Sequence, residues 1–147
     1  MNSKDLEHTV SIARCSRYHP GDIRESLEQL LKPWGGIRSF IKPAQRILLK
    51  PNLLTAVSPE EAVTTHPVLI HVLAEMIREA GGKVFIGDSP GSLPPEQVYR
   101  ATGIEAAAQA TGAGLLHFNA LSPVNPGGSK RGELPLTAAL IEAAAQA

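Results

Sequence analysis

Two short apolar runs separated by one amphipathic segment constrain the fold of this chain more than any other feature. Residues 47–49 and 84–86 are uninterrupted apolar runs followed by polar residues and turn formers, which is typical of short buried strands. Between them, residues 67–80 begin with proline, carry a wide apolar stripe and end before two glycines, which predicts a helix. The order strand, helix, strand predicts a β-α-β unit.

Further elements are expected on both sides of this unit. Residues 8–14 alternate between two faces, with Val10 and Ile12 on one of them, which predicts a half-buried first strand. Asp22 and Glu25 have the spacing of a capping box, and the apolar residues after them recur at helical spacing. We also expect helices over residues 94–100 and 104–110 and a short strand over residues 115–118.

These elements predict one α/β domain spanning residues 1–147. The chain has 147 residues and 43% hydrophobic content, which is long enough for one core and too short to expect two. We expect a Rossmann-like, three-layer sandwich with a mostly parallel sheet of about four strands and helices on both faces. Residues 122–134 are rich in turn formers and are predicted to be a flexible loop.

The charge balance and the cysteine count exclude several classes of protein. Lys plus Arg equals Asp plus Glu at 14 each, so no electrostatic footprint for nucleic acid or a membrane surface is expected. Cys15 is the only cysteine, which excludes an internal disulfide and a four-cysteine zinc or iron–sulfur site within this chain. No apolar run approaches the roughly 18 residues of a membrane span, and a cytoplasmic protein is the expectation.

Polar residues gather where the two central strands end. Lys50 and Asn52 follow the first of these strands, and Asp88 and Ser89 follow the second. In an open parallel sheet, ligands bind in the crevice outside the carboxyl ends of the strands, so these positions indicate a site. Each residue also has a structural interpretation: Lys50 could extend to water, and the others could stabilise turns.

Thr65 and His66 stand just before the proline that begins the central helix. Thr65 could hydrogen-bond a ligand or satisfy a free N–H of the first helical turn. The helix dipole disfavours an imidazolium at His66, so a neutral ring acting as hydrogen-bond donor or metal ligand is expected there. A histidine that caps the helix or faces solvent remains an open alternative, and no metal site is assigned.

Standard nucleotide and hydrolase motifs do not fit the sequence. It contains neither the G-x-G-x-x-G of dinucleotide-binding folds nor the G-x-x-x-x-G-K-S/T of P-loops. Ser89 stands in a formal G-x-S-x-G, but Pro90 removes the backbone N–H that an oxyanion hole of this type uses. Serine hydrolase chemistry is therefore not expected.

Four motifs together resemble the domain-of-unknown-function 362 family. They are K-P-N-L-L at 50–54, P-E-E-A-V-T-T-H-P at 59–67, G-D-S-P-G at 87–91 and T-G-I-E at 102–105, and the similarity covers most of residues 10–118. The resemblance implies a bacterial or archaeal cytoplasmic protein of unsettled biochemistry, often with ferredoxin-like cysteine clusters later in a longer chain. Relatives continue past residue 141 into another apolar strand and a P-K-x-K-T-H-like motif, which this sequence lacks. Neither that motif nor any cluster ligand is carried over.

Two functions are compatible with these observations. The first is an enzyme domain that binds a small anionic or phosphorylated ligand. In it Lys50 is the charge partner, Asn52, Thr65 and Ser89 contact the ligand, His66 transfers a proton and Asp88 orients the group. The alternative is a non-catalytic scaffold or interaction module, related to iron–sulfur-associated redox proteins but lacking the cluster. The sequence assigns no cofactor, and it leaves open whether the chain is an enzyme. We expect either a homo-oligomer or a missing C-terminal region to cover apolar surface on the last strand.

Overall fold

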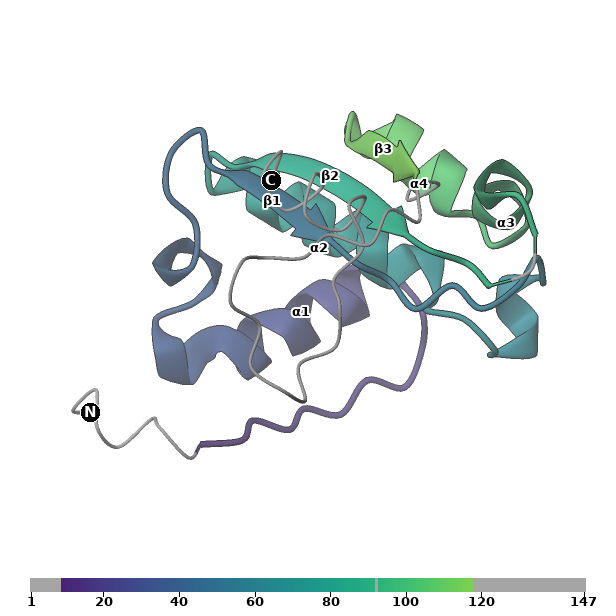
Figure 1. The fold of residues 1–147 in the computed structure, drawn as a ribbon. Helices are drawn as coiled ribbons and strands as arrows, with labels where there is room; N and C mark the ends of the chain where they lie inside the picture. Colours follow the sequence, from purple (N-terminus) through teal and green to yellow (C-terminus); the bar gives the residue numbers. More distant parts are fainter. Residues whose placement is uncertain (1–8, 92, 118–147) are drawn as a thin grey trace, which may run out of the picture.

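The computed structural model describes residues 9–91 and 93–117, which form a parallel sheet with helices packed against it (Figure 1). The strands are β1 (Arg46–Leu49), β2 (Lys83–Asp88) and β3 (Gly114–His117), in the order β1-β2-β3. The helices are α1 (Pro20–Leu31), α2 (Pro67–Glu79), α3 (Pro95–Ala101) and α4 (Ile104–Thr111). Short 3-10 turns are η2 (Lys32–Trp34), η3 (Ile37–Ser39) and η4 (Pro59–Glu61).

The predicted β-α-β unit is confirmed. β1 and β2 are parallel, with Leu49 opposite Ile86, and α2 connects them. β2 and β3 are also parallel, with Asp88 opposite His117, and α3 and α4 connect them. α2 begins with proline, where a missing N–H costs nothing, and Gly81 follows its end with a φ of 94°, which a residue with a side chain rarely adopts.

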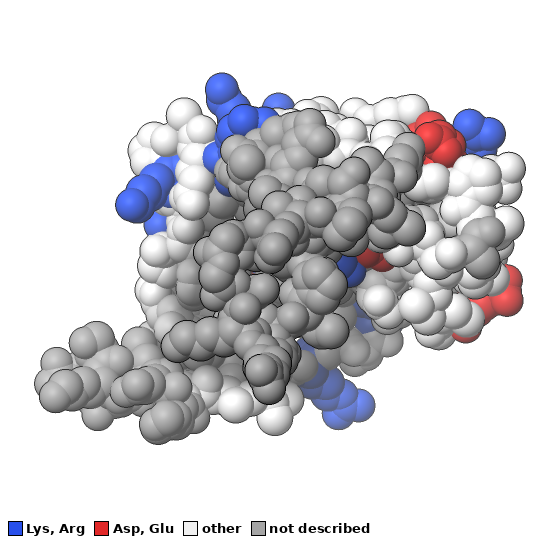
Figure 2. Space-filling model, viewed as in Figure 1, with Lys and Arg blue, Asp and Glu red and all other residues white. Residues whose placement is uncertain are grey.

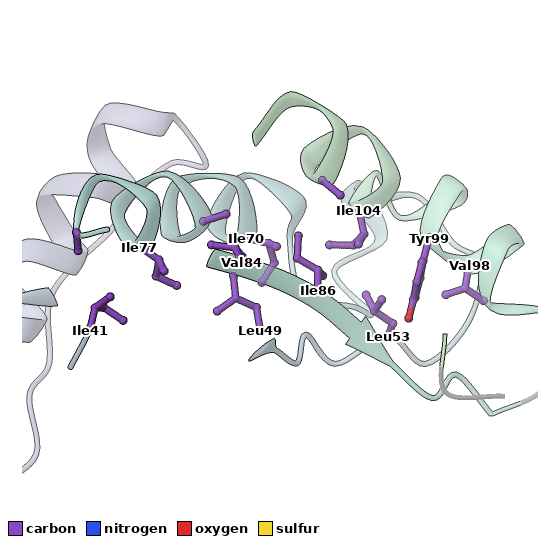
Figure 3. Packing of buried hydrophobic residues seen from close by; sticks show 13 residues of the cluster. Ile41, Leu49, Leu53, Ile70, Ile77, Val84, Ile86, Val98, Tyr99 and Ile104 are labelled. Atoms are coloured by element: carbon purple, nitrogen blue, oxygen red, sulfur yellow. The ribbon is translucent and has the colours of Figure 1, made fainter. Parts of the chain in front are cut away.

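The core lies between the sheet and the pair α2 and α4 (Figure 3). Ile86 of the central strand is fully buried and packs in one cluster with Ile70 of α2 and Ile104 of α4. Leu53, just after β1, and Tyr99 of α3 extend this cluster towards the carboxyl ends of the strands. Each such side chain contributes about 1.5–3 kcal/mol relative to an exposed one, so the core fixes the loops at that edge.

The first predicted strand is wrong. Residues 9–19 form neither helix nor strand but run as an extended segment beside α1 (Figure 1). Val10 and Ile12, expected on a half-buried face, are 83% and 92% exposed. The segment touches α1 where the Arg14 carbonyl lies 3.3 Å from the Ser26 hydroxyl. Alternation identifies two faces of an extended chain, but a strand also needs a neighbouring edge with which to pair.

The predicted layering is therefore only partly correct. The described part of the chain is α/β with three parallel strands, not about four, since the first predicted strand does not form. α2 and α4 contact each other and the sheet, whereas α1 packs on α2. Two successive right-handed crossovers in one direction place their helices on one face of a sheet, so Rossmann-like layering is not confirmed. The predicted loop at 122–134 lies outside the described residues.

Candidate functional site

Lys50 and Asp88 meet at the carboxyl ends of β1 and β2. The Lys50 Nζ lies 2.6 Å from Oδ1 of Asp88. Asp88 ends β2 and is buried, whereas the Lys50 side chain is 53% exposed. The second carboxylate oxygen of Asp88 accepts a hydrogen bond of 2.8 Å from the backbone N–H of Leu53. Asp88 therefore holds the lysine ammonium and the loop after β1 in place at once.

Asn52 and Thr65 form a two-bond clasp at the base of the loop that joins β1 to α2. The Asn52 N–H donates to the Thr65 hydroxyl at 2.9 Å, and the Thr65 N–H donates to the Asn52 carbonyl at 3.1 Å. Within this loop, Ser58 and Glu61 form a capping box around η4. The clasp uses the Thr65 hydroxyl as an acceptor, so its own proton stays available for another bond.

His66 is the N-cap of α2, and its Nδ1 accepts a hydrogen bond of 3.3 Å from the Val68 N–H. Its ring is stacked on Tyr18, with 3.8 Å between ring centroids and 4° between the planes. Burial lowers the pKa of His66, and the nearby Glu60 carboxylate opposes this effect more weakly. With Nδ1 used as an acceptor, the neutral ring carries its proton on Nε2, which makes it a hydrogen-bond donor.

Tyr99 is a central residue of this edge that sequence reasoning missed. Its hydroxyl accepts the Asp88 N–H at 2.8 Å and lies 2.8 Å from the Leu116 carbonyl, to which it can donate. It is almost completely buried, and desolvation raises the pKa of its phenol. The His117 ring packs on the Tyr99 ring at 5.2 Å between centroids, and its Nδ1 lies 3.7 Å from Glu96. A buried tyrosine hydroxyl needs a polar partner, but the sequence does not show that Tyr99 is buried.

The predicted site residues thus fall into two directly bonded pairs and two single positions. Lys50 and Asp88 are in contact, as are Asn52 and Thr65, and His66 follows Thr65 in the chain. Ser89 is exposed immediately after β2. Whether Lys50, Asn52, His66 and Asp88 line one pocket stays a prediction.

Basic and acidic side chains both occur on the visible described surface (Figure 2). In the described part of the chain, no cluster of three or more His, Cys, Asp or Glu side chains is arranged to hold a metal ion. None of the helices in residues 9–91 and 93–117 is long and apolar enough to cross a membrane.

Comparison with known proteins identifies the family. The sequence model described as "Domain of unknown function (DUF362)" matches residues 47–145. This chain therefore belongs to the DUF362 family, which confirms the resemblance of its motifs. It is 39% identical over 110 residues to the thylakoid-associated protein sll1697 of Synechocystis sp., an alignment that covers 75% of this chain. The chain spans about a third (34%) of the length of that relative. No solved structure matches the chain.

Proposed function

We propose that this chain binds a small anionic or phosphorylated ligand at the carboxyl ends of β1 and β2. The observation that carries this proposal is the placement of Lys50. Its ammonium is anchored at 2.6 Å by the buried Asp88, yet its side chain is 53% exposed. An ammonium has three donors, so the bond to Asp88 leaves others to be offered to a ligand. A ligand anion then meets a positive group that is already positioned.

Uncharged donors around Lys50 support the same ligand class. The side-chain amide of Asn52, the hydroxyl protons of Thr65 and Ser89 and the Nε2–H of neutral His66 all belong to the loops at this edge. α2 begins directly after His66, and the N-terminus of a helix favours negative charge. The negative charge of Asp88 is balanced by Lys50 and by the Leu53 N–H, which reduces its repulsion of a bound anion.

The residues divide into ligand-contacting groups and one positioning group. Lys50 supplies charge, and Asn52 and Thr65 supply hydrogen bonds. His66 is the group of suitable chemistry to donate or accept a proton, because its neutral form is the favoured one. Asp88 acts through Lys50 and the loop it holds, so it orients the site. A non-catalytic scaffold or interaction module is the alternative that remains if no ligand binds.

Calorimetry and thermal shift with inorganic phosphate and small carboxylates test the proposal. An anion present at 100 times its dissociation constant stabilises the folded chain by about 2.7 kcal/mol. A hydrogen bond to a charged group contributes about 1.5–3 kcal/mol, so Lys50→Ala is expected to weaken anion binding roughly tenfold or more. Lys50→Arg keeps the charge and is expected to retain most of the affinity.

The matched control is Lys83→Ala. Lys83 is also exposed, but it stands at the amino end of β2, on the opposite edge of the same sheet. Lys83→Ala is expected to leave the affinity for the anion unchanged. The proposal fails if no anion stabilises the wild-type chain, or if Lys50→Ala and Lys83→Ala bind with the same affinity as the wild type at low salt.

A further inference from the structure

One histidine ring connects the start of α2 to a segment that is distant in the chain. His66 caps α2 through the Val68 N–H, and one face of its ring is covered by Tyr18 from the segment before α1. The residue before it, Thr65, closes the clasp with Asn52. The start of α2 and the N-terminal segment therefore meet at a single titratable group, which follows the clasp by one residue in the chain.

The capping bond exists only while His66 is neutral. Nδ1 accepts the Val68 N–H through its lone pair, and a protonated imidazole has donors at both nitrogens and no acceptor. Protonation would therefore set two N–H groups against each other and place a positive charge at the helix N-terminus, where the dipole disfavours it. The helix would lose the acceptor that satisfies one of its free N–H groups.

The groups near the His66 ring have opposing effects on its pKa. Tyr18 covers one face and helps to exclude water, and burial lowers the pKa of His66. The same aromatic face attracts a cation, and the carboxylate of Glu60, from η4, also favours the charged ring. Among the described residues, Tyr18 and Glu60 are the titratable groups of neighbouring segments that act on the His66 ring. Tyr18 can remain stacked on the charged ring, so the bond to Val68 is the contact that protonation removes.

We propose that His66 is a proton-operated latch on the loop at the carboxyl edge of the sheet. In the neutral state the latch closes the first turn of α2 and holds the adjacent Asn52–Thr65 clasp. In the protonated state it releases the Val68 N–H and loosens both. This device does not depend on the proposed anion site, since it needs only groups of the chain itself.

A second histidine provides a control within the same molecule. His19 caps α1 as His66 caps α2: it also precedes a proline, and its Nδ1 accepts the Gly21 N–H at the same 3.3 Å. Its side chain is 69% exposed, and the Asp22 carboxylate lies 3.9 Å from its Nδ1. Replacing His19 alters an equivalent cap without changing a residue of α2.

The test is a pH titration of the full chain from 7.5 to 5, followed by the amide resonances of Val68 and Thr65 and the ring resonances of His66. We expect all three to move together, with one midpoint below the ordinary histidine value of 6.5. In His66→Asn the cap is kept but does not titrate, so the movement of Val68 should disappear. His19→Asn should leave it unchanged.

Tyr18→Ala exposes the ring of His66 and should move the midpoint back towards the ordinary value. The proposal is refuted if the amide resonance of Val68 does not move with pH, or if it moves equally in His66→Asn. If His66→Asn fails to fold, the wild type still decides: different midpoints for the His66 ring and the Val68 amide would overturn the proposal.

Discussion

Removing the hydroxyl of Tyr99 tests how the carboxyl edge of the sheet is held together. In Tyr99→Phe the ring stays in the core, but the Asp88 N–H loses its acceptor and the Leu116 carbonyl loses a donor. A buried polar group left without a partner costs about 1–3 kcal/mol. Two groups are affected and the surroundings relax in part, so we expect a loss of roughly 2–3 kcal/mol of unfolding free energy. That is a large share of the 5–15 kcal/mol typical of a domain.

Urea denaturation followed by circular dichroism measures this loss. With m between about 1 and 3 kcal/mol/M, the midpoint should fall by about 1 M while m stays constant. In the wild type, the raised pKa of Tyr99 adds an alkaline limb to the dependence of the unfolding free energy on pH. The stability that the buried phenol contributes is fully present below its ordinary pKa of 10.0. It is lost as pH rises from there through the pKa of the folded state, because the buried phenol resists ionisation. Tyr99→Phe should lack this limb.

Tyr18→Phe is the matched control, because it removes the same atom from a residue that is 61% exposed. It should change stability by no more than about 0.5 kcal/mol. If Tyr99→Phe is equally mild, the hydroxyl does not hold Asp88 and Leu116 together and the reasoning about this edge is wrong.

Two further predictions concern packing and charge. A Cβ at Gly114 would lie 2.8 Å from a ring carbon of Phe85, so Gly114→Ala should lose about 1–3 kcal/mol in urea. Gly91→Ala, with nothing within 4 Å, should be nearly neutral, and equal effects would contradict this. Arg24 lowers the pKa of Glu79, so Glu79→Gln should cost under about 1 kcal/mol at pH 7. That cost should vanish as pH falls below 4.5 through the pKa of Glu79 in the folded state. A cost that does not depend on pH would show that the charge of Glu79 is not its source.

Much of the β-α-β unit could be predicted because its signals are local. The apolar run before Lys50, the proline at the start of α2 and the glycines after it each act on neighbouring residues, and the structure confirms the elements they predict. The segment around Val10 and Ile12 shows the limit of this reasoning. Its alternation is real, but no described strand lies beside it, and the presence of a partner edge is not a local property.

The candidate site, like the fold, could be predicted from the sequence only in part. Lys50 and Asp88 were expected at one edge because parallel strands end together, and they are in contact. Tyr99 could not be placed from sequence, since its partners are backbone groups on two strands and any strand offers such groups. The stacking of Tyr18 on His66 was equally hidden, because it depends on how α1 packs on α2.

The clasp between Asn52 and Thr65 also determines how this region can vary in length. Because both ends of the loop are already tied together, additional residues near Ala62 would extend a closed loop instead of opening a new one. Doubling the length of a flexible loop costs only about 0.6 kcal/mol in closure entropy. The tip can therefore change in length at little cost in stability, while Lys50 and Asp88 keep their positions.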